Sequence, residues 1–538
     1  MVKKKNQMFK LPSLDTLNTA HKVGQFFMPA AFINDTEEEI QKLENLIKNY
    51  HIGSLCFFHS RASAATNFEG KKKVIRNEKS IDRLKELITR YQKISEIPLL
   101  IAIDAEWGLA MRIENAPQYP YPITLGALQN QDKLIFEIGY NIGLDCKEAG
   151  IHWNLAPVLD INNNPENPVI GYRSFSDEKE KVKIKAGAFL DGMKHAGVLN
   201  SLKHFPGHGD TNVDSHLGLP VIDKSEQELF QNELYLYQEL LKRDIDSVMV
   251  AHLSLPQIDD SGNPSSISKK IINRLLRKKM SYDGVIISDA LNMHAVSKRY
   301  PENGTLEAAA FDAGMDMLCF PENPIEGIET ILATSDASRI EESFNRIWKL
   351  KQKTFETYFQ KENVRKKTCK ELNIAVAKNC ITELGLEEKV FNQIKKDKFL
   401  NLSYGNPKKN NFSKSLEKQF GQAHLKLTSQ SLEDILSKAE QYQNIVLALF
   451  PPSNKPKNQF GFEPEVLDLI QRLLIENKVI LYLFGNPYVL NIFEHKAKSG
   501  IVLMYQDFSE FQEMALDHFL GKISAKGKLP VKLKGFTE

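Results

Sequence analysis

The 538-residue sequence has no apolar run long enough to cross a membrane, and it has little cysteine. A membrane-spanning helix needs about 20 consecutive apolar residues. Lys3-Lys4-Lys5 is followed by polar residues and not by the apolar core of a signal peptide. The five cysteines are scattered, odd in number and without a Cys-x-x-Cys pair, which favours free buried thiols in a reducing compartment. We therefore expect a cytoplasmic protein with no membrane partner.

A strong charge of one sign is also missing. The chain has 70 Lys and Arg against 68 Asp and Glu, a formal net charge of +2. Because no overall field attracts nucleic acid, a nucleic-acid partner is not expected. The hydrophobic share of 42% and the charged share of 26% are typical of a globular protein. No pattern in the sequence indicates an oligomeric state.

Internal repeats and low-complexity tracts are absent, and the chain is too long for one ordinary core. Up to about residue 350, short apolar runs alternate with amphipathic stretches at 36–50, 80–94 and 225–242. The predicted strands lie at 54–58, 99–103, 151–155, 199–202, 246–250, 285–288 and 315–318. Seven or eight parallel βαβ units predict an α/β fold with a (β/α)8 TIM-type barrel over residues 1–350.

A second alternating pattern follows a charged, helix-like stretch. We expect a helical linker over 351–370 and a smaller α/β sandwich domain over 371–538. The apolar runs 444–450, 479–484 and 500–504 are the predicted strands of that domain, because they are separated by helix-like stretches.

One loop of the predicted barrel carries an unusual mixture of ionisable residues. The run from Lys203 to His216 contains three histidines, two aspartates and a lysine. Its Pro-Gly and Gly-Asp steps are incompatible with a regular helix or strand. The loop follows the predicted strand 199–202, and α/β barrels present catalytic groups where their strands end. We therefore interpret it as a catalytic loop, since an ordinary solvated loop does not require this mixture.

The sequence Lys-His-Phe-Pro-Gly-His-Gly followed by Asp-Ser-His resembles the signature of glycoside hydrolase family 3. More narrowly, it is similar to the bacterial β-N-acetylglucosaminidase (NagZ-type) branch. The resemblance implies a retaining exo-β-N-acetylhexosaminidase that removes terminal N-acetylglucosamine from peptidoglycan turnover fragments. Three alternatives stay open: a β-glucosidase of the family, an N-acetylglucosaminide phosphorylase, and an inactive sugar-binding or scaffold module.

The resemblance also implies the catalytic roles. Asp289 follows the predicted strand 285–288 and is the expected nucleophile, although an aspartate there could also cap a following helix. His216 with Asp214 is the expected acid/base, because an imidazole exchanges protons near neutrality and a carboxylate can hold its other ring nitrogen. Local turn chemistry is the competing interpretation of that pair. A neutral histidine repels phosphate less than a carboxylate does, which keeps phosphorolysis open.

Five residues match the family's substrate-binding positions: Asp104, Arg112, Arg173, Lys203 and His204. The family's usual Asp-Gln-Glu-Gly-Gly-Arg pattern is altered here at Ala105, Trp107 and Leu109. Carboxylate and guanidinium groups suit sugar hydroxyls because they give charge-assisted hydrogen bonds of fixed geometry. Arg173 has a second interpretation as a solvated surface charge. His252 is predicted either to face the same pocket or to be a satisfied core histidine.

No metal and no cofactor are expected. His204 and His208 are four residues apart, which is the spacing of a helical zinc pair. Pro206-Gly207 between them argues against a helix, so the two rings need not share a face. The expected partner is a carbohydrate substrate.

Overall fold

The computed structural model describes residues 10–59, 79–213, 218–358, 362–405, 407, 409–430, 432–493 and 500–536. The chain forms two compact units that interleave along the sequence. The first comprises Met1–Tyr119, Ile135–Ile161 and Val182–Lys366, and the second Pro120–Leu134, Asn162–Lys181 and Lys367–Glu538. The domains predicted from the sequence were consecutive ranges, 1–350 and 371–538. The structure differs, because residues 120–134 and 162–181 join the second unit.

The strands of the first unit close into a parallel barrel. They are β1 (Phe27–Met28), β2 (Ala30–Phe32), β3 (Ser54–Phe58), β4 (Leu100–Ile103), β5 (Trp153–Asn154), β6 (Ser201–Phe205), β7 (Ser247–Val250), β8 (Val285–Ser288) and β9 (Leu318–Cys319). They pair in parallel as β1–β9, β2–β3–β4–β5 and β6–β7–β8. Single parallel bridges join Trp153 to Leu199 and Ile287 to Met317. Because β1 and β2 flank Pro29 and occupy one position, the ring is that of a (β/α)8 barrel, as predicted.

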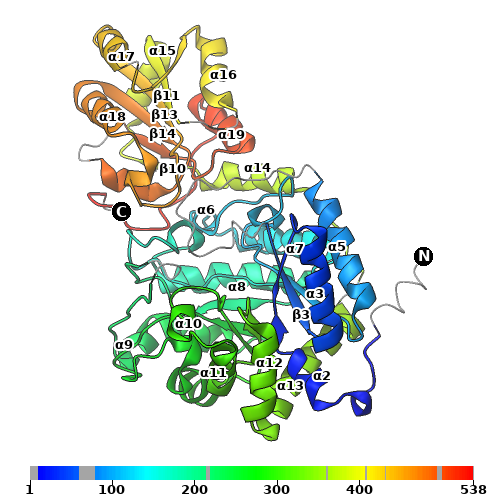
Figure 1. Ribbon diagram of the computed structural model, residues 1–538. Helices are drawn as coiled ribbons and strands as arrows, with labels where there is room; N and C mark the ends of the chain where they lie inside the picture. Colours follow the sequence, from blue (N-terminus) through cyan, green and yellow to red (C-terminus); the bar gives the residue numbers. More distant parts are fainter. Residues whose placement is uncertain are drawn as a thin grey trace. The chain divides into compact units, whose positions relative to one another are not determined.

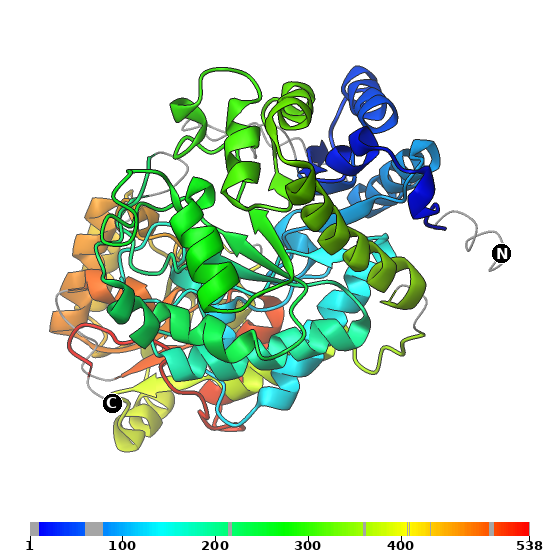
Figure 2. The same ribbon diagram turned by 90° about the horizontal axis from the view of Figure 1, so that it is seen from below.

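A helix or helical segment follows each strand position, and together they surround the strands of this unit (Figure 1; Figure 2). These are α3 (Glu37–Tyr50), α5 (Ser80–Ile94), α7 (Asp132–Ala149), α8 (Lys179–Ala196), α9 (Glu226–Gln231) with α10 (Glu233–Leu240), Lys270–Lys279, α11 (Thr305–Ala313) and α12 (Pro324–Thr334). Helix α2 (Thr19–Gly24) precedes the barrel and α13 (Ala337–Gln352) follows it.

Helix α3 illustrates how the sequence specifies these elements. The Thr36 hydroxyl accepts the backbone N–H of Glu39, and the Glu39 carboxylate accepts the backbone N–H of Thr36 at 2.8 Å. This capping box satisfies two backbone donors that the first helical turn leaves without partners. Ile40, Leu43 and Ile47 then recur at helical spacing and form the buried stripe.

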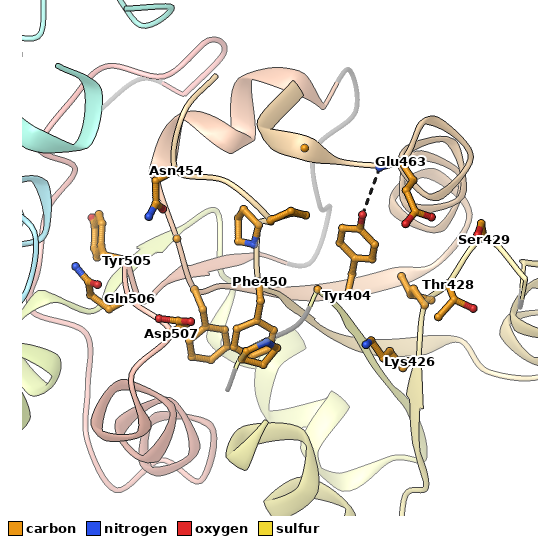
Figure 3. A pocket seen from close by; sticks show the side chains of 18 of the residues that line it. Tyr404, Lys426, Thr428, Ser429, Phe450, Asn454, Glu463, Tyr505, Gln506 and Asp507 are labelled. Carbon is orange, nitrogen blue, oxygen red and sulfur yellow. Dashed lines mark hydrogen bonds between the residues drawn. The ribbon is translucent and has the colours of Figure 1, made fainter. Parts of the chain in front are cut away.

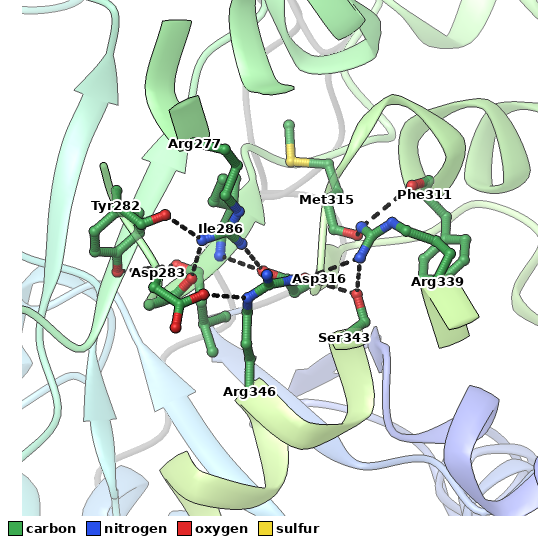
Figure 4. A network of polar contacts seen from close by, with 12 residues as sticks. Arg277, Tyr282, Asp283, Ile286, Phe311, Met315, Asp316, Arg339, Ser343 and Arg346 are labelled. Atoms are coloured by element: carbon green, nitrogen blue, oxygen red, sulfur yellow. Dashed lines mark hydrogen bonds and ion pairs between the residues drawn. The ribbon is translucent and has the colours of Figure 1, made fainter. Parts of the chain in front are cut away.

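A buried carboxylate connects the amino end of β9 to the helices around it (Figure 4). Asp316 is fully buried and accepts the backbone N–H of Ile286 at 2.9 Å and the Ser343 hydroxyl at 2.6 Å. Three guanidinium groups pair with the same carboxylate: Arg277, Arg339 and Arg346. Burial alone raises the pKa of Asp316, but the three positive charges outweigh burial and hold it below its ordinary value.

The second unit is built on a mostly parallel sheet with the order β10-β15-β14-β13-β11-β12, of which β10 is antiparallel. The strands are β10 (Thr382–Leu384), β11 (Phe399–Tyr404), β12 (His424–Lys426), β13 (Asn444–Leu449), β14 (Lys478–Leu483) and β15 (Ile501–Leu503). The helices are α6 (Pro122–Gly126), α14 (Cys369–Cys380), α15 (Glu388–Lys396), α16 (Asn411–Phe420), α17 (Leu432–Ala439), α18 (Pro464–Glu476) and α19 (Ser509–Phe519). Every residue of β11 and β13 is buried.

The linker differs from its prediction. Helix α13 continues as a helical turn over Lys353–Tyr358, and α14 begins at Cys369, but residues 362–368 form no helix. The charged sequence there has no apolar stripe to bury, and Thr368 caps the helix that follows.

Candidate active site

Two carboxylates and two cations form an ion-paired cluster where β4 and β6 end. Lys203 is 1% exposed, and its Nζ lies 2.8 Å from Asp104 Oδ1 and 2.7 Å from Glu106 Oε1. Arg112 Nη2 donates to the second oxygen of Asp104 at 2.8 Å. The Arg112 guanidinium also lies 3.8 Å from the ring centre of Phe58. The structure therefore brings together three of the five predicted sugar-binding residues.

The two cations keep Asp104 ionised. Burial alone raises the pKa of this carboxyl group, but the charges and hydrogen bonds of Lys203 and Arg112 outweigh burial and hold it far below its ordinary value. Asp104 is only partly covered, so it retains access to a ligand. An ionised carboxylate held at a fixed angle is a strong acceptor for sugar hydroxyls.

His204 and His208 are both anchored by Asp160. His204 Nδ1 donates to Asp160 Oδ2 at 2.6 Å, and the backbone N–H of His208 donates to Oδ1 at 2.7 Å. The Thr211 hydroxyl lies 2.9 Å from His208 Nδ1. Burial, with a smaller effect from His204, lowers the pKa of His208 to about 4, so its ring is neutral at neutral pH. Asp160 thus fixes the His204 ring and the path of the loop beyond it.

Asp289 lies directly beyond the carboxyl end of β8. Its backbone N–H donates to the carbonyl of Val250 at 2.9 Å, and its Oδ1 accepts the backbone N–H of Ala290 at 2.8 Å. Turns follow it, and the next helical turn begins only at Ser297, so the alternative role as a helix cap is wrong. The side chain is half-buried, which suits a group that must meet both enzyme and substrate.

His252 is fully buried and holds the chain next to Asp289. Its Nε2 lies 3.0 Å from the carbonyl oxygen of Ala290, which can only accept, so Nε2 carries the proton. Nδ1 then accepts the Ser266 hydroxyl at 2.6 Å. Of the two predicted roles for His252, the structure thus favours that of a satisfied core histidine. We interpret it as a residue that positions the turn after β8.

The charges of Asp104 and Asp289 act on a common neighbour. A hydrogen bond with Cys56 and burial raise the pKa of the Cys319 thiol well above its ordinary value, and the negative charges of both aspartates add to this rise. The Asp289 charge also acts on His208. Asp104 and Asp289 directly follow the carboxyl ends of β4 and β8, so the predicted nucleophile lies at the same end of the barrel as the ion-paired cluster.

Three predicted residues cannot be placed with this group. Asp214 and His216 lie outside the described residues, so the acid/base assignment stays a prediction. Arg173 belongs to the second unit, in a short helical turn over Gly171–Arg173, and its Nη1 donates to the carbonyl of Val169 at 3.4 Å. Its contact with substrate also stays a prediction.

Sequence reasoning missed Asp160 and did not assign a role to Glu106. Asp160 lies 44 residues before His204, and the pairing that joins them depends on adjacent strand positions in the closed barrel. A local signal existed, because Asp160 follows the apolar pair Val158-Leu159 beyond a predicted strand. Its position beyond a predicted strand, at the end of the barrel that carries catalytic groups, therefore marks Asp160 as a candidate partner of the histidines in the Lys203–His216 run.

Among the described residues, a group of potential metal ligands converges elsewhere. Ligand atoms of His21, His51 and Glu96 lie within 4.8 Å of one another. His51 precedes β3 and Glu96 precedes β4, so this group lies at the amino ends of the barrel strands, opposite the cluster around Lys203. His204 and His208 are not part of it.

Comparison with known families agrees with this arrangement. Residues 18–350 match the family described as "Glycosyl hydrolase family 3 N terminal domain". The chain belongs to glycosyl hydrolase family 3. It is therefore a glycosidase by family, and the barrel is the part that carries the match. No helix in the described part of the chain has the length and apolar character needed to span a membrane.

Two curated relatives are β-hexosaminidases. Beta-hexosaminidase A of Pseudoalteromonas piscicida is 34% identical over 296 residues, which cover 52% of this chain and 47% of that protein. Beta-hexosaminidase of Tolumonas auensis is 35% identical over 273 residues, covering 49% of this chain and 80% of that protein. The chain thus spans about half the length of the first relative and most of the second.

Solved structures extend the likeness to both units. A glycoside hydrolase family 3 beta-N-acetylglucosaminidase from Paenibacillus sp. str. FPU-7 has a TM-score of 0.78 at 26% identity, covering 97% of this chain and 100% of that chain. Beta-glucoside phosphorylase BglX also has a TM-score of 0.78, at 22% identity, covering 99% of this chain and 95% of that chain. The second likeness is one of fold alone.

Proposed function

We propose that this chain is a retaining exo-β-N-acetylhexosaminidase with a carbohydrate substrate. The observation that carries the proposal is the half-buried carboxylate of Asp289 at a barrel strand end, in the same region as the ion-paired Asp104, Lys203 and Arg112. The names of the relatives support N-acetylated hexose as the sugar. Terminal N-acetylglucosamine of peptidoglycan turnover fragments in the cytoplasm is the substrate and location that the sequence signature favours.

The proposed reaction has two steps. The Asp289 carboxylate attacks the anomeric carbon, the bond to the leaving oxygen breaks, and His216 donates a proton to that oxygen. Water then attacks the same carbon, gives its proton to His216, and releases the sugar and the carboxylate. Two inversions leave the β configuration unchanged. Asp214 would hold the second ring nitrogen and stabilise the imidazolium.

Paired substrates test the proposed sugar specificity. We expect faster hydrolysis of an aryl N-acetyl-β-glucosaminide than of the matching aryl β-glucoside, by about tenfold or more in kcat/KM, because a site that binds the acetamido group leaves its polar atoms without partners when the glucoside binds. The measurement is release of the phenol by both substrates. A preference for the glucoside would contradict the proposal.

The same assay tests phosphorolysis. With inorganic phosphate present, hydrolysis gives free sugar and a phosphorylase gives sugar 1-phosphate. We expect free sugar only. Sugar 1-phosphate as the main product would establish the phosphorylase alternative, which a neutral histidine acid/base permits. Absence of turnover on both glycosides would favour the inactive module.

His216→Ala should slow substrates according to their leaving group. General acid/base assistance is worth about 10²–10⁴-fold, but a good aryl leaving group needs little protonation. We expect a larger loss of kcat/KM on N,N′-diacetylchitobiose than on an activated aryl glycoside, and a milder form of the same pattern in Asp214→Asn. Equal losses on both substrates would rule out His216 as the acid.

A further inference from the structure

The second unit has a ligand-sized cavity at the carboxyl ends of its parallel strands (Figure 3). Its volume is about 540 Å³, and its walls come from the ends of β11, β13, β14 and β15, from the residues around β12, and from Tyr121. All of these belong to the second unit. None of them is used by the proposed reaction.

The strand order explains why a cavity forms there. Side by side in the sheet, the parallel strands are ordered β12-β11-β13-β14-β15, so the chain passes from β11 to β12 on one side and from β13 to β14 on the other. In open α/β sheets, ligands bind outside the carboxyl ends of strands at such a reversal. Gly405 and Pro451, which follow β11 and β13, both line the cavity.

Four buried aromatic residues are part of the lining, beside polar groups that supply most of its accessible surface. Tyr404, Phe450, Phe484 and Tyr505 are each at most 5% exposed. Phe450 and Phe484 stack with their centres 4.6 Å apart and 9° between their planes. The Tyr404 hydroxyl accepts the backbone N–H of Glu463 at 3.3 Å (Figure 3), which ties the inner wall to the rim.

The rim is polar and includes both hydrogen-bond donors and acceptors. Its exposed side chains include Lys426, Thr428, Glu463 and Asp507. Deeper in, Gln506 is 2% exposed, and its Nε2 donates to the Thr124 hydroxyl at 2.9 Å. Among the described lining residues, the carboxylates of Glu463 and Asp507 outnumber the single cation, Lys426. The lining therefore disfavours an anionic ligand such as phosphate.

The backbone around the cavity is held in an uncommon conformation. Tyr505 has φ of 63°, and three consecutive residues of the loop leading to Glu463, Asn458, Gln459 and Phe460, have φ of 53°, 51° and 58°. Non-glycine residues in the left-handed region are strained and gather at binding sites. The strain at Tyr505 lies where the chain leaves β15 and presents Gln506 and Asp507 to the cavity.

We propose that this cavity is a binding site for a neutral saccharide. The carboxylates, amide, hydroxyl and amine of the lining would bind the hydroxyls of a sugar ring, and the smaller apolar part of the wall would contact its C–H groups. Neither Asp289 nor any other residue assigned to the proposed reaction lines this cavity, so the proposal goes beyond the proposed glycosidase activity. The choice of N,N′-diacetylchitobiose as the probe, and the mole expected to bind at the barrel, rest on that activity.

Equilibrium dialysis of labelled N,N′-diacetylchitobiose against the full-length Asp289→Asn chain tests the site without turnover. Thr428→Trp places a large ring at the exposed rim, where it should block the cavity. Gln430→Trp adds the same ring two residues along at an exposed position that does not line the cavity. We expect two moles bound per mole in the parent and in the Gln430 variant, and one mole in the Thr428 variant.

The outcomes separate this proposal from the proposed function. One mole bound by the parent and none by Thr428→Trp would support the cavity site while contradicting saccharide binding at the barrel. One mole bound by both the parent and the Thr428→Trp variant, or no binding by either, would overturn the cavity site. So would a cavity that binds AMP in place of the sugar, with that binding lost in Thr428→Trp. As a second variant, Asp507→Ala should weaken the cavity site about tenfold, whereas Glu510→Ala, partly exposed and outside the lining, should not.

Discussion

Asp289→Asn is expected to abolish turnover, with a loss of about 10⁴-fold or more in kcat, while the protein remains folded. The amide oxygen of asparagine can still accept the backbone N–H of Ala290, so the turn after β8 keeps its hydrogen bond. An amide cannot form the glycosyl ester, so the covalent pathway is lost. The measurement is kcat on the aryl N-acetyl-β-glucosaminide, alongside thermal unfolding of the same sample.

The matched control is Asp312→Asn. This aspartate is in α11, its side chain is 69% exposed, and its contact is an ion pair with Lys269. It should retain full activity, because exposed ion pairs contribute little. Normal activity in a folded Asp289→Asn protein would refute the nucleophile assignment.

Product stereochemistry gives a second and sharper test of the same residue. In Asp289→Ala, azide can occupy the vacated space and attack the anomeric carbon directly, displacing the aryl oxide. A single inversion gives the α-glycosyl azide. In His216→Ala, the ester on Asp289 still forms, and azide then displaces it with a second inversion to give the β-glycosyl azide. If both variants gave the same anomer, the two roles could not be as assigned.

The sequence predicted the barrel because its strand–helix alternation is local. The predicted strands at 54–58 and 285–288 match β3 and β8 in their bounds. The first strand position was missed because Pro29 divides an already short apolar run into β1 and β2. Strand β11 was missed because Asn401 and Ser403 make its sequence alternate, although both side chains are buried and hydrogen-bonded.

The candidate site was predictable where a motif marks a strand end and not where partners meet across the barrel. Lys203 and Asp104 were identified individually, but their ion pair joins residues 99 positions apart. Asp160 carries no motif of its own, and its importance depends on the histidines that fold against it. The interleaving of the units has the same cause, because residues 120–134 and 162–181 show their association with the second unit only through long-range packing.

Asp316 carries the largest expected effect on stability. Asp316→Ala would leave three guanidinium groups around a site without its carboxylate, and breaking a buried ion pair by removing one partner costs about 3–5 kcal/mol. The effect should depend on pH. Because the folded-state pKa is lowered, the contribution of Asp316 is complete above its unfolded pKa and is lost as pH falls through the folded value. The difference between wild type and variant should therefore shrink in acid.

The chain supplies both a probe and a matched control for this test. Its three tryptophans, Trp107, Trp153 and Trp348, all belong to the first unit, so their fluorescence during denaturant unfolding reports the free energy of unfolding of that unit. Asp283 pairs with Arg346 at 3.2 Å, but its side chain is 80% exposed. Asp283→Ala should therefore cost no more than about 1 kcal/mol. Asp316 and Asp283 both pair with Arg346. Equal losses of unfolding free energy in the two variants would therefore mean that the other buried contacts of Asp316 do not stabilise the barrel.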